Sequence, residues 1–437
     1  MRPRHSWERL AILLVLFKVG YFALICAASI FWPNFDKGVF FSGIARWPPE
    51  GGPDFASHFG TWDAAHYLLL SKVGYAKNSA SCAFYPLWPL AIRFVANLTG
   101  ADHLIVGLLL ANGFSLAGWL LFYYNTSRRF GESVASLALI LLITFPGSLF
   151  YQFVYSESLF FLILMLLFFG LERNQSCVAL LAAFLLPLTR GVGVFSILPI
   201  VWHAFRHKQV GIFPIRGFRP WPKIFMRSGH SQTSCGAAAS VQHREHRTVQ
   251  MPGRTSSVWC FKIAKAIWCQ TNYRNVAIVF APIMGLLTYF CLIKLWTGNP
   301  FEGLQAQKYW RNIHSIRNLW NLPKFVVGFL SPDAWHAFKG SVLDRGLFLI
   351  LMYTLPRIWR LGKDMLIWAY VLGILPAMSG TFVSFTRFES IVFPMFVALA
   401  SFFYEAKNKF LLLIVITVSV TLHAILVWRF VNFRWAG

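Results

Sequence analysis

The chain has 437 residues, of which 57% are hydrophobic and 13% are charged, whereas soluble domains carry about 25% charged residues. Its apolar residues form long runs, and residues 10–32, 276–296 and 410–428 each approach the ~20 residues that cross a bilayer. Runs of this length argue against a large soluble enzyme with buried helices. The sequence therefore predicts an all-α, polytopic integral membrane protein.

The net charge of +24 comes from 40 Lys and Arg residues against 16 Asp and Glu residues. On a soluble protein this excess would indicate nucleic-acid binding, but here the basic residues cluster in short segments between apolar runs. Such clusters stay in the cytoplasm, so we expect contacts with anionic membrane lipids and no nucleic-acid partner. The seven cysteines include no CxxC pair and predict no disulfide framework.

The first span, residues 10–32, follows the basic segment MRPRHSWER, which indicates an uncleaved signal anchor with a cytoplasmic N-terminus. Residues 33–83 then form a large external loop, rich in Pro, Gly and aromatic residues. Residues 84–98 are apolar but short and contain Pro86 and Pro89, which favours a helix lying at, or dipping into, the outer surface over a tilted span.

Further spans are expected where apolar segments end at basic residues, at 104–124, 133–150, 156–171 and 177–204. The last of these segments contains Pro187, Arg190 and Gly191. A single helix would bury Arg190 at the centre of the bilayer, which costs at least ~2.5–3.5 kcal/mol. We therefore predict two short or re-entrant helices with Arg190 at the outer turn between them.

Residues 206–274 carry 12 Lys or Arg residues and one acid, Glu245, with little periodicity. This composition predicts a disordered cytoplasmic loop, and its His and Cys residues fit no zinc-finger spacing.

The second half of the chain repeats the alternation of apolar and basic segments. Spans are expected at 275–296, 343–355, 365–378, 391–404 and 410–428, with a second large external loop at 297–342. The sequence thus predicts about 10–11 membrane segments. They divide into an N-terminal transmembrane module, 1–205, and a C-terminal one, 275–437.

Asp63 lies in the first external loop, in the segment TWDAAHYLLL. A helix would place Asp63, His66 and Tyr67 on one side, because they stand at i, i+3 and i+4. A carboxylate beside a bilayer surface is a candidate for chemistry. However, Trp62 and Tyr67 also suit ordinary interface aromatics, and Asp63 suits a helix N-terminal acid, so both interpretations stay open.

Other polar residues fall at the outer ends of apolar segments. Glu157 follows Tyr155 in the turn YSES, where an acid also suits the first turn of a helix. Arg190 needs a partner such as a phosphate or Glu157. Arg387 stands just before the span at 391–404, where it could also snorkel to the interface.

The second external loop contributes Gln305, Gln307 and Trp310, which suit sugar binding or an ordinary loop helix. Carboxylates, arginines and aromatic residues on one face suit a substrate with a phosphate, a sugar and a lipid tail. The arginines would hold phosphate oxygens in charge-assisted contacts, and a carboxylate would take a proton from an acceptor hydroxyl.

Four segments resemble, in order, motifs of the PIG-V family, the GPI mannosyltransferase 2 family. They read TWDAAHYLLLSKVGYAKNSASCAFYPLWPL, VYSESLFFLILMLLFFGLER, LTRGVGV and TRFESIVFPMFVALA. In the family, WD-x-x-H-[FY] is followed by GY and by F-[FY]-P-x-x-P. Next come YSE-x-L-F, an arginine at a glycine-bearing helix break, and R-F before a Pro-containing span.

The resemblance implies a GT-C glycosyltransferase with an acidic catalytic residue in its first external loop. It implies transfer of a hexose, usually mannose, from a polyprenyl-phosphate donor to a hydroxyl acceptor, with inversion at the anomeric carbon. By position Asp63 matches the family's WD aspartate, so it is the expected general base or the acid that positions the acceptor. Asp54 is the second candidate. The expected substrate-binding residues are Trp62, His66, Tyr67, Tyr155, Glu157, Arg190, Gln305, Trp310 and Arg387.

The chain also departs from the family pattern. Thr61 stands where the eukaryotic motif commonly has His, Arg190 is followed by GVG rather than S-N-G, and residues 206–274 have no counterpart. The chain is closer to the prokaryotic branch, whose hosts lack GPI anchors, which leaves the acceptor and the sugar open. We expect the plasma membrane if the source is bacterial or the endoplasmic reticulum membrane if it is eukaryotic, with the active site on the external or lumenal face.

The resemblance requires no cofactor, and no metal-ligand pattern is visible. A divalent cation on external acids stays open, because other GT-C branches use one, and the sequence sets no oligomeric state. Two other classes of function also stay open. A lipid or solute transporter or flippase would show charged or broken helices at the bilayer midplane with repeat symmetry, and a non-catalytic subunit would assist another glycosyltransferase.

Overall fold

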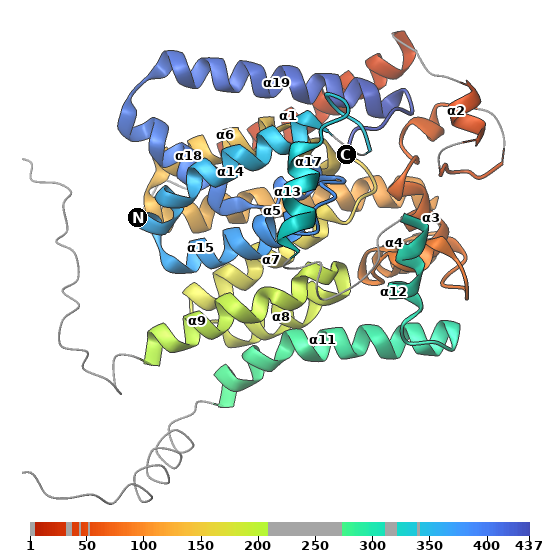
Figure 1. Ribbon diagram of the computed structural model, residues 1–437, viewed down its shortest axis with the longest axis horizontal. Coiled ribbons are helices and arrows are strands. Elements are labelled where there is room, and N and C mark those ends of the chain that lie inside the picture. Colours follow the sequence, from red (N-terminus) through yellow and green to blue (C-terminus); the bar gives the residue numbers. More distant parts are fainter. Residues whose placement is uncertain are drawn as a thin grey trace, which may run out of the picture. The chain divides into compact units, whose positions relative to one another are not determined.

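The computed structural model describes residues 5–31, 37–42, 45–50, 53–208, 273–310, 321–338 and 341–437. Within these ranges the regular structure is helical, with two isolated β-bridges and no strand (Figure 1). The predicted all-α fold class is confirmed.

The first half of the chain forms long helices that alternate with short ones. Its elements are α1 (His5–Phe31), α2 (Lys37–Ser42), η1 (Ala56–His58), α3 (Asp63–Lys72), η2 (Ala80–Ala83), α4 (Leu87–Thr99), α5 (His103–Phe130), α6 (Glu132–Thr144), η3 (Pro146–Tyr151), α7 (Glu157–Glu172), α8 (Ser176–Thr189), η4 (Gly191–Ser196) and α9 (Ile197–Lys208).

The second half begins with a long helix and ends with another. Its elements are α11 (Tyr273–Thr297), α12 (Glu302–Ala306), η5 (Gln307–Trp310), α13 (Leu322–Leu330), α14 (Val342–Leu361), α15 (Lys363–Ala369), the π-helical η7 (Tyr370–Ile374), α16 (Leu375–Ala377), α17 (Phe385–Glu389), α18 (Phe393–Ala406) and α19 (Lys409–Val431).

Four helices of the described residues are long and apolar enough to cross a membrane, namely Trp7–Phe31, His103–Phe130, Asn275–Thr297 and Lys409–Val431. Four shorter apolar helices accompany them, and the chain is a membrane protein. The expected total of 10–11 membrane segments stays a prediction.

Residues 1–204 and 274–437 form one compact unit. The two expected transmembrane modules therefore pack as a single body. The second unit, 205–273, lies almost wholly outside the described residues, as does the predicted cytoplasmic loop 206–274.

The apolar segment 177–204 breaks at Arg190, as predicted. Helix α8 ends at Thr189, and η4 and α9 follow in a new direction. Close packing explains the glycines after the arginine. A Cβ at Gly191 would lie 2.4 Å from the Tyr85 hydroxyl, and one at Gly193 would lie 2.4 Å from the Leu186 carbonyl carbon. Arg190 thus sits at a helix end instead of inside a span.

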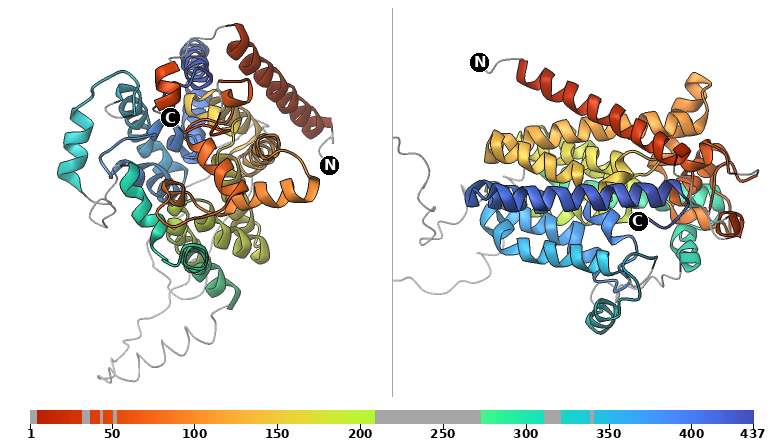
Figure 2. Two further views of the ribbon diagram at one scale, coloured as in Figure 1. Left: turned by 90° about the vertical axis from the view of Figure 1, so that its right-hand side faces the viewer. Right: turned by 90° about the horizontal axis from the view of Figure 1, so that it is seen from above.

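Helix α4 has one buried and one exposed face. Trp88 and Ile92 are fully buried, whereas Phe94 and Leu98 are exposed. This one-sided pattern suits the helix expected at the outer surface. Helices α3, α4 and α12 gather at one end of the bundle, on the right of Figure 1, and Figure 2 shows the same end from two further directions.

A buried lysine fastens α1 to the interior of the bundle. The Lys18 Nζ donates hydrogen bonds to Ser115 Oγ (2.6 Å), Gln152 Oε1 (3.1 Å), Asn112 Oδ1 (3.2 Å) and the Tyr151 carbonyl (3.2 Å). A charge inside a membrane helix is expensive unless polar groups surround it. The four oxygens meet that need and tie α1 to α5 and η3.

Candidate active site

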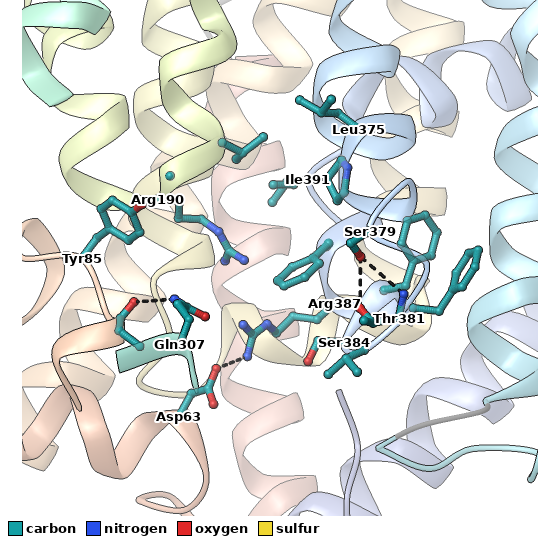
Figure 3. Close-up of a pocket in the computed structure, with 18 of the residues that line it drawn as sticks. Asp63, Tyr85, Arg190, Gln307, Leu375, Ser379, Thr381, Ser384, Arg387 and Ile391 are labelled. Carbon is teal, nitrogen blue, oxygen red and sulfur yellow. Dashed lines mark hydrogen bonds and ion pairs between the residues drawn. The ribbon is translucent and has the colours of Figure 1, made fainter. Parts of the chain in front are cut away.

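A cavity of about 430 Å³ opens between segments that are far apart in the sequence (Figure 3). Ligand pockets in proteins typically measure ~300–1,000 Å³. The charged and polar residues of its lining are Asp63, Tyr67, Tyr85, Thr189, Arg190, Gln307, Lys324, Ser379, Thr381, Ser384 and Arg387. The rest of the wall is mainly apolar and includes Phe195, Leu372, Leu375, Phe388 and Ile391.

Asp63 begins α3 directly after a strained residue. Trp62 has φ 58° and ψ −131°, a conformation that residues with a Cβ rarely adopt. Its indole packs edge-on against Trp435, with ring centroids 5.2 Å apart. Such backbone strain costs of order 1–3 kcal/mol and clusters at functional sites. The contact with Trp435 helps hold the turn that aims Asp63 at the cavity.

Arg387 is carried by α17, which also follows residues with positive φ. Phe382 has φ 50° and Ser384 has φ 60°. The next segment is fixed from behind, because Asp344 Oδ1 accepts hydrogen bonds from the Thr386 amide (2.6 Å) and the Thr386 hydroxyl. The guanidinium of Arg387 is thereby directed into the cavity.

Arg387 binds two carboxylates. Its Nη1 contacts Asp63 Oδ2, and its Nε lies 2.8 Å from Glu157 Oε1. Figure 3 shows the Asp63 pair as a dashed line. Burial alone would lower the pKa of Arg387, but Glu157 and Asp63 together raise it above its usual value. Arg387 is therefore a permanent cation in a poorly hydrated site.

Arg190 shares Glu157 with Arg387. Its Nη1 contacts Glu157 Oε1 and lies 3.5 Å from Ser156 Oγ, and its guanidinium stacks 4.9 Å from the centre of the Phe388 ring. Glu157 is fully buried in the first turn of α7, where the helix dipole favours an acid. One carboxylate behind the cavity thus holds both guanidinium groups.

Aromatic side chains complete the charged cluster. Tyr155 packs against Arg387, whose guanidinium carbon lies 5.2 Å from the ring centre. Tyr67 lines the cavity and donates a 2.9 Å hydrogen bond to Ser156 Oγ. Burial, and then Glu157, raise the pKa of Tyr67, so its hydroxyl stays protonated. Burial also raises the pKa of Tyr85 to about 12.

Several residues expected at the site do not line the cavity. Asp54 is exposed and lies just before η1, where its Oδ1 accepts hydrogen bonds from the Ser57 amide (2.7 Å) and hydroxyl (2.5 Å). His66 stacks on Phe84 behind the wall, and burial lowers its pKa although Asp63 partly opposes this.

Of the two glutamines expected to suit sugar binding in the second external loop, only Gln307 lines the cavity. Gln305 is exposed and accepts a 2.9 Å hydrogen bond from Asn299, away from the cavity. Gln307, two residues further on, lines the cavity and donates a 3.3 Å hydrogen bond to the Ala83 carbonyl (Figure 3). Trp310 ends η5, and its side chain lies outside the described residues.

The sequence reasoning did not single out several lining residues. Lys324 on α13 is an exposed cation on the cavity wall, and Trp435 reaches the wall from the C-terminal tail. The loop 379–384 supplies the hydroxyls of Ser379 and Thr381, which lie 3.1 Å apart. No local motif identifies these residues as part of a site. For Lys324, the available signal was its place in a short amphipathic helix that begins with a proline.

Glu389 ends α17, two residues after Arg387. It is fully buried, and neither carboxyl oxygen has a hydrogen-bond partner among the described residues. Burial, and then the Asp344 carboxylate, raise the pKa of Glu389 well above its usual value. Glu389 is therefore neutral at a pH where an exposed glutamate would be ionised.

Metal ligands do not gather in the described part of the chain. No group of three or more His, Cys, Asp or Glu side chains in those ranges is placed to hold a metal ion. The positive charge at the cavity comes instead from Arg190, Arg387 and Lys324.

Comparison with protein families gives the class of the protein. Residues 55–290 match the family model described as Mannosyltransferase (PIG-V), and the chain is a membrane glycosyltransferase. Because the match covers more than half of the sequence, the chain belongs to the PIG-V mannosyltransferase family, and the resemblance of its motifs is confirmed. The comparison with curated protein sequences gives no match.

Among solved structures, the chain is similar to crystal structures of an oligosaccharyltransferase from Archaeoglobus fulgidus. Against the form with Zn and sulfate it has 13% identity and a TM-score of 0.44, covering 96% of this chain and 53% of that one. The apo form has 12% identity and a TM-score of 0.44, and the match covers 98% of this chain and 56% of that one. The form tethered to an acceptor peptide has 13% identity and a TM-score of 0.47, and the match covers 99% of this chain and 56% of that one. The chain spans just over half the length of these solved chains.

Proposed function

We propose that this protein transfers a hexose, mannose in the first instance, from a polyprenyl-phosphate donor to a hydroxyl of an acceptor at the external face of the membrane. The observation that carries the proposal is the meeting of Asp63, Arg190 and Arg387 in one cavity whose remaining wall is largely apolar. The resulting site has groups for a proton, a phosphate and a lipid chain.

The arginines suit the phosphate of the donor. Asp63 and Glu157 balance their two charges, while the cavity wall adds the cation Lys324. Guanidinium groups bind phosphate oxygens in charge-assisted contacts. As the bond between the anomeric carbon and the phosphate oxygen breaks, the leaving phosphate gains negative charge that these cations stabilise.

Asp63 suits the general base. Arg387 contacts its Oδ2, which leaves Oδ1 to accept the proton of the acceptor hydroxyl. The hydroxyl oxygen then attacks the anomeric carbon while polyprenyl phosphate leaves with the bonding electron pair. A single displacement of this kind inverts the configuration at that carbon. In a related role, Asp63 would orient the acceptor without taking its proton.

The apolar part of the wall suits the first isoprene units of the donor. Phe195, Leu372, Leu375 and Ile391 line it next to the arginines. A polyprenyl tail would remain in the bilayer while its phosphate reaches the polar end.

The distribution of basic residues supports an external site. Arg129 at the end of α5 binds Asp364, with Nη2 2.8 Å from Oδ1, and lies 3.3 Å from Glu172 at the end of α7. Glu157, which serves the cavity, begins the same α7, and a helix of 16 residues is about 24 Å long. Basic ends stay in the cytoplasm, so the cavity would face outward.

The test is turnover by the purified chain in proteoliposomes. Labelled polyprenyl-phosphate mannose and glucose would be supplied separately with an extract of membrane glycoconjugates, and transfer to a new product would be followed by chromatography. We expect transfer from one donor, with release of polyprenyl phosphate. Movement of the intact donor between leaflets without any transfer would contradict the proposal and indicate a flippase. Absence of transfer until a second subunit is added would indicate a non-catalytic role.

A further inference from the structure

Two adjacent residues at the start of α14, Asp344 and Arg345, are buried behind the cavity and line none of it. A charged pair in such a place needs partners, because burying a charge without them is very unfavourable. The two side chains do not pair with each other by any contact shorter than 4 Å among the described residues. Each binds a different segment of the cavity wall.

Asp344 holds the segment that carries Arg387. Its Oδ1 accepts hydrogen bonds from both the amide (2.6 Å) and the hydroxyl of Thr386. Helix α17 has only five residues, too few to be stable through its own hydrogen bonds. A Cβ at Gly147 of η3 would also lie 2.0 Å from the Thr386 carbonyl oxygen, so α17 packs closely against η3 as well as binding Asp344.

Arg345 holds the helix that carries Lys324. Its Nε lies 2.9 Å from the carbonyl oxygens of Gly328 and Phe329, and its Nη2 lies 3.4 Å from that of Ser331. These carbonyls belong to the end of α13, where a helix leaves its last four carbonyl groups without intrahelical partners. Helix α13 has no fully buried residue, but its Phe325 and Phe329 pack against Phe348 and Phe382. The contact with Arg345 adds a polar attachment at the end of the helix.

A close backbone contact completes the arrangement. A Cβ at Gly328 of α13 would lie 2.0 Å from the Gly380 carbonyl oxygen, in the loop that leads to α17. Helix α13 and this loop therefore lie directly against each other.

We propose that Asp344 and Arg345 are positioning residues that set the placement of Arg387 and Lys324, and thereby the binding site for the donor phosphate. The inference rests on the proposed function, since it assigns the two cations to that phosphate. Asp344 acts through Thr386 on the guanidinium that also holds Asp63. Arg345 acts through the end of α13 on the outer cation. Neither residue touches the substrate.

The first test compares Asp344→Asn with Asp344→Ala. The amide oxygen of Asn can still accept both hydrogen bonds from Thr386, whereas Ala accepts neither. A displacement of about 1 Å at a reacting centre costs up to ~100-fold, so we expect Asp344→Ala to lose about 10- to 100-fold in kcat and Asp344→Asn to stay within about threefold of wild type. Equal kcat for the folded fractions of Asp344→Ala and wild type would overturn the proposal.

The second test uses Arg345→Lys. A lysine is a point charge that cannot bind several carbonyls in a fixed fork, so α13 should loosen while α17 stays in place. The expected result is a rise of about 2- to 5-fold in KM for the donor, the range of one exposed charge contact, with kcat unchanged. A fall in kcat with constant KM would contradict the assignment of Arg345 to Lys324.

Asp364→Ala is the matched control. Asp364 is also largely buried and binds Arg129 through two contacts, at the other end of the bundle. This variant should lower the melting temperature and keep both kcat and KM. If Asp364→Ala changes kcat as much as Asp344→Ala does, general destabilisation explains both effects, and Asp344 is not a positioning residue.

An activity-free measurement separates this inference from the proposed function. A double-mutant cycle of Asp344→Ala and Thr386→Val in melting temperature reports their contact directly, and we expect the two effects to be less than additive. If wild type transfers no sugar but the cycle shows coupling, the proposed function fails, and the contact between Asp344 and Thr386 is still confirmed.

If Asp344→Ala does not fold, the isosteric variant Thr386→Val replaces it in the test. We expect Thr386→Val to lose about threefold in kcat, and an unchanged kcat would overturn the proposal.

Discussion

Arg387 contacts Asp63 across 324 positions of the sequence. The carboxylate begins α3 in the first external segment, and the guanidinium comes from α17 near the C-terminal end. Both groups are largely buried, with side chains 12% and 9% exposed. Neither half of the chain therefore contains a complete site. The roles of Asp63 and Arg387 can be tested directly by substitution.

Replacing each candidate base separately should distinguish Asp63 from Asp54. Loss of general-base catalysis typically costs 10²–10⁴-fold, so we expect Asp63→Asn to lose about that factor in kcat. Asp54→Asn should remain within about twofold, because Asp54 lies outside the cavity and the amide oxygen of Asn can still accept the hydrogen bonds from Ser57. Rates with labelled donor decide, and an Asp63→Asn enzyme of full activity would show that Asp63 is not the base.

Removing Arg387 should affect stability more than removing Arg190. Arg387→Met leaves Asp63 without its cation, and loss of one partner of a buried pair costs about 3–5 kcal/mol. After Arg190→Met, Glu157 still has Arg387, so we expect a smaller loss, of about 1–2 kcal/mol, and a raised KM for the donor. Thermal unfolding in detergent measures the first quantity and initial rates the second. Equal destabilisation by the two variants would argue against the shared role of Glu157.

The backbone at Ser384 gives a test of strain. Its φ of 60° lies in the left-handed region, which costs a residue with a Cβ about 1–2 kcal/mol. Ser384→Gly should leave stability unchanged or raise it by up to ~1 kcal/mol, after the greater flexibility of unfolded Gly is counted. Ser384→Val should lower it by about 1–2 kcal/mol, because a β-branched residue is least suited to this conformation. Melting temperatures in the opposite order would contradict the strained geometry.

Glu389 should make stability depend on pH. Its native pKa is raised, so above the ordinary value of 4.5 the unfolded chain releases a proton that the native chain keeps. Stability from this group therefore falls as pH rises from about 4.5 towards the native pKa, and Glu389→Gln should remove that fall. The midpoint of thermal unfolding, measured between pH 4.5 and 8, tests the difference.

Glu302→Gln is the control for Glu389→Gln. Glu302 is also buried, but it accepts hydrogen bonds from the Asn78 amide (2.6 Å) and the Asn299 side chain (3.3 Å). Replacing it should lower stability at neutral pH, the opposite sign from Glu389→Gln. If both variants shift the midpoint of unfolding in the same direction, Glu389 is not neutral in the native protein.

We also expect turnover to persist in the presence of a chelator. Arg190 and Arg387 already offer positive charge where the phosphate would leave, which is the electrostatic role that a divalent cation would otherwise perform. Initial rates with and without EDTA should agree within about twofold. Loss of activity that Mg²⁺ or Mn²⁺ restores would show that an ion takes part.

The pattern of apolar runs was sufficient to predict the helical fold and the break at Arg190, since a long run interrupted by a charge has few solutions in a membrane. Motif order pointed to Asp63, Glu157, Arg190 and Arg387, which the structure brings together. The contact of Arg190 with Glu157 was one of the expected possibilities. The sharing of Glu157 with Arg387 and the pair of Arg387 with Asp63 could not be predicted, because they depend on packing between helices that are distant in sequence.

The remaining wall could not be predicted for a different reason. Gln305 and Gln307 are two residues apart, but Gln305 lies in α12 and Gln307 begins η5, and only the folded structure places Gln307 at the cavity. Lys324 and Trp435 reach the wall only through tertiary packing of α13 and the C-terminal tail. Such tertiary contacts cannot be predicted from the spacing of residues in the sequence.

The basic segment 206–274 separates the two stretches of sequence that build the cavity. Asp63, Glu157 and Arg190 precede it, and Lys324 and Arg387 follow it, while residues 1–204 and 274–437 fold as one unit. A continuous peptide link across this segment is thus no requirement of the cavity itself. Two polypeptides, 1–205 and 275–437, made together in one membrane, should complement each other and restore transfer that neither provides alone.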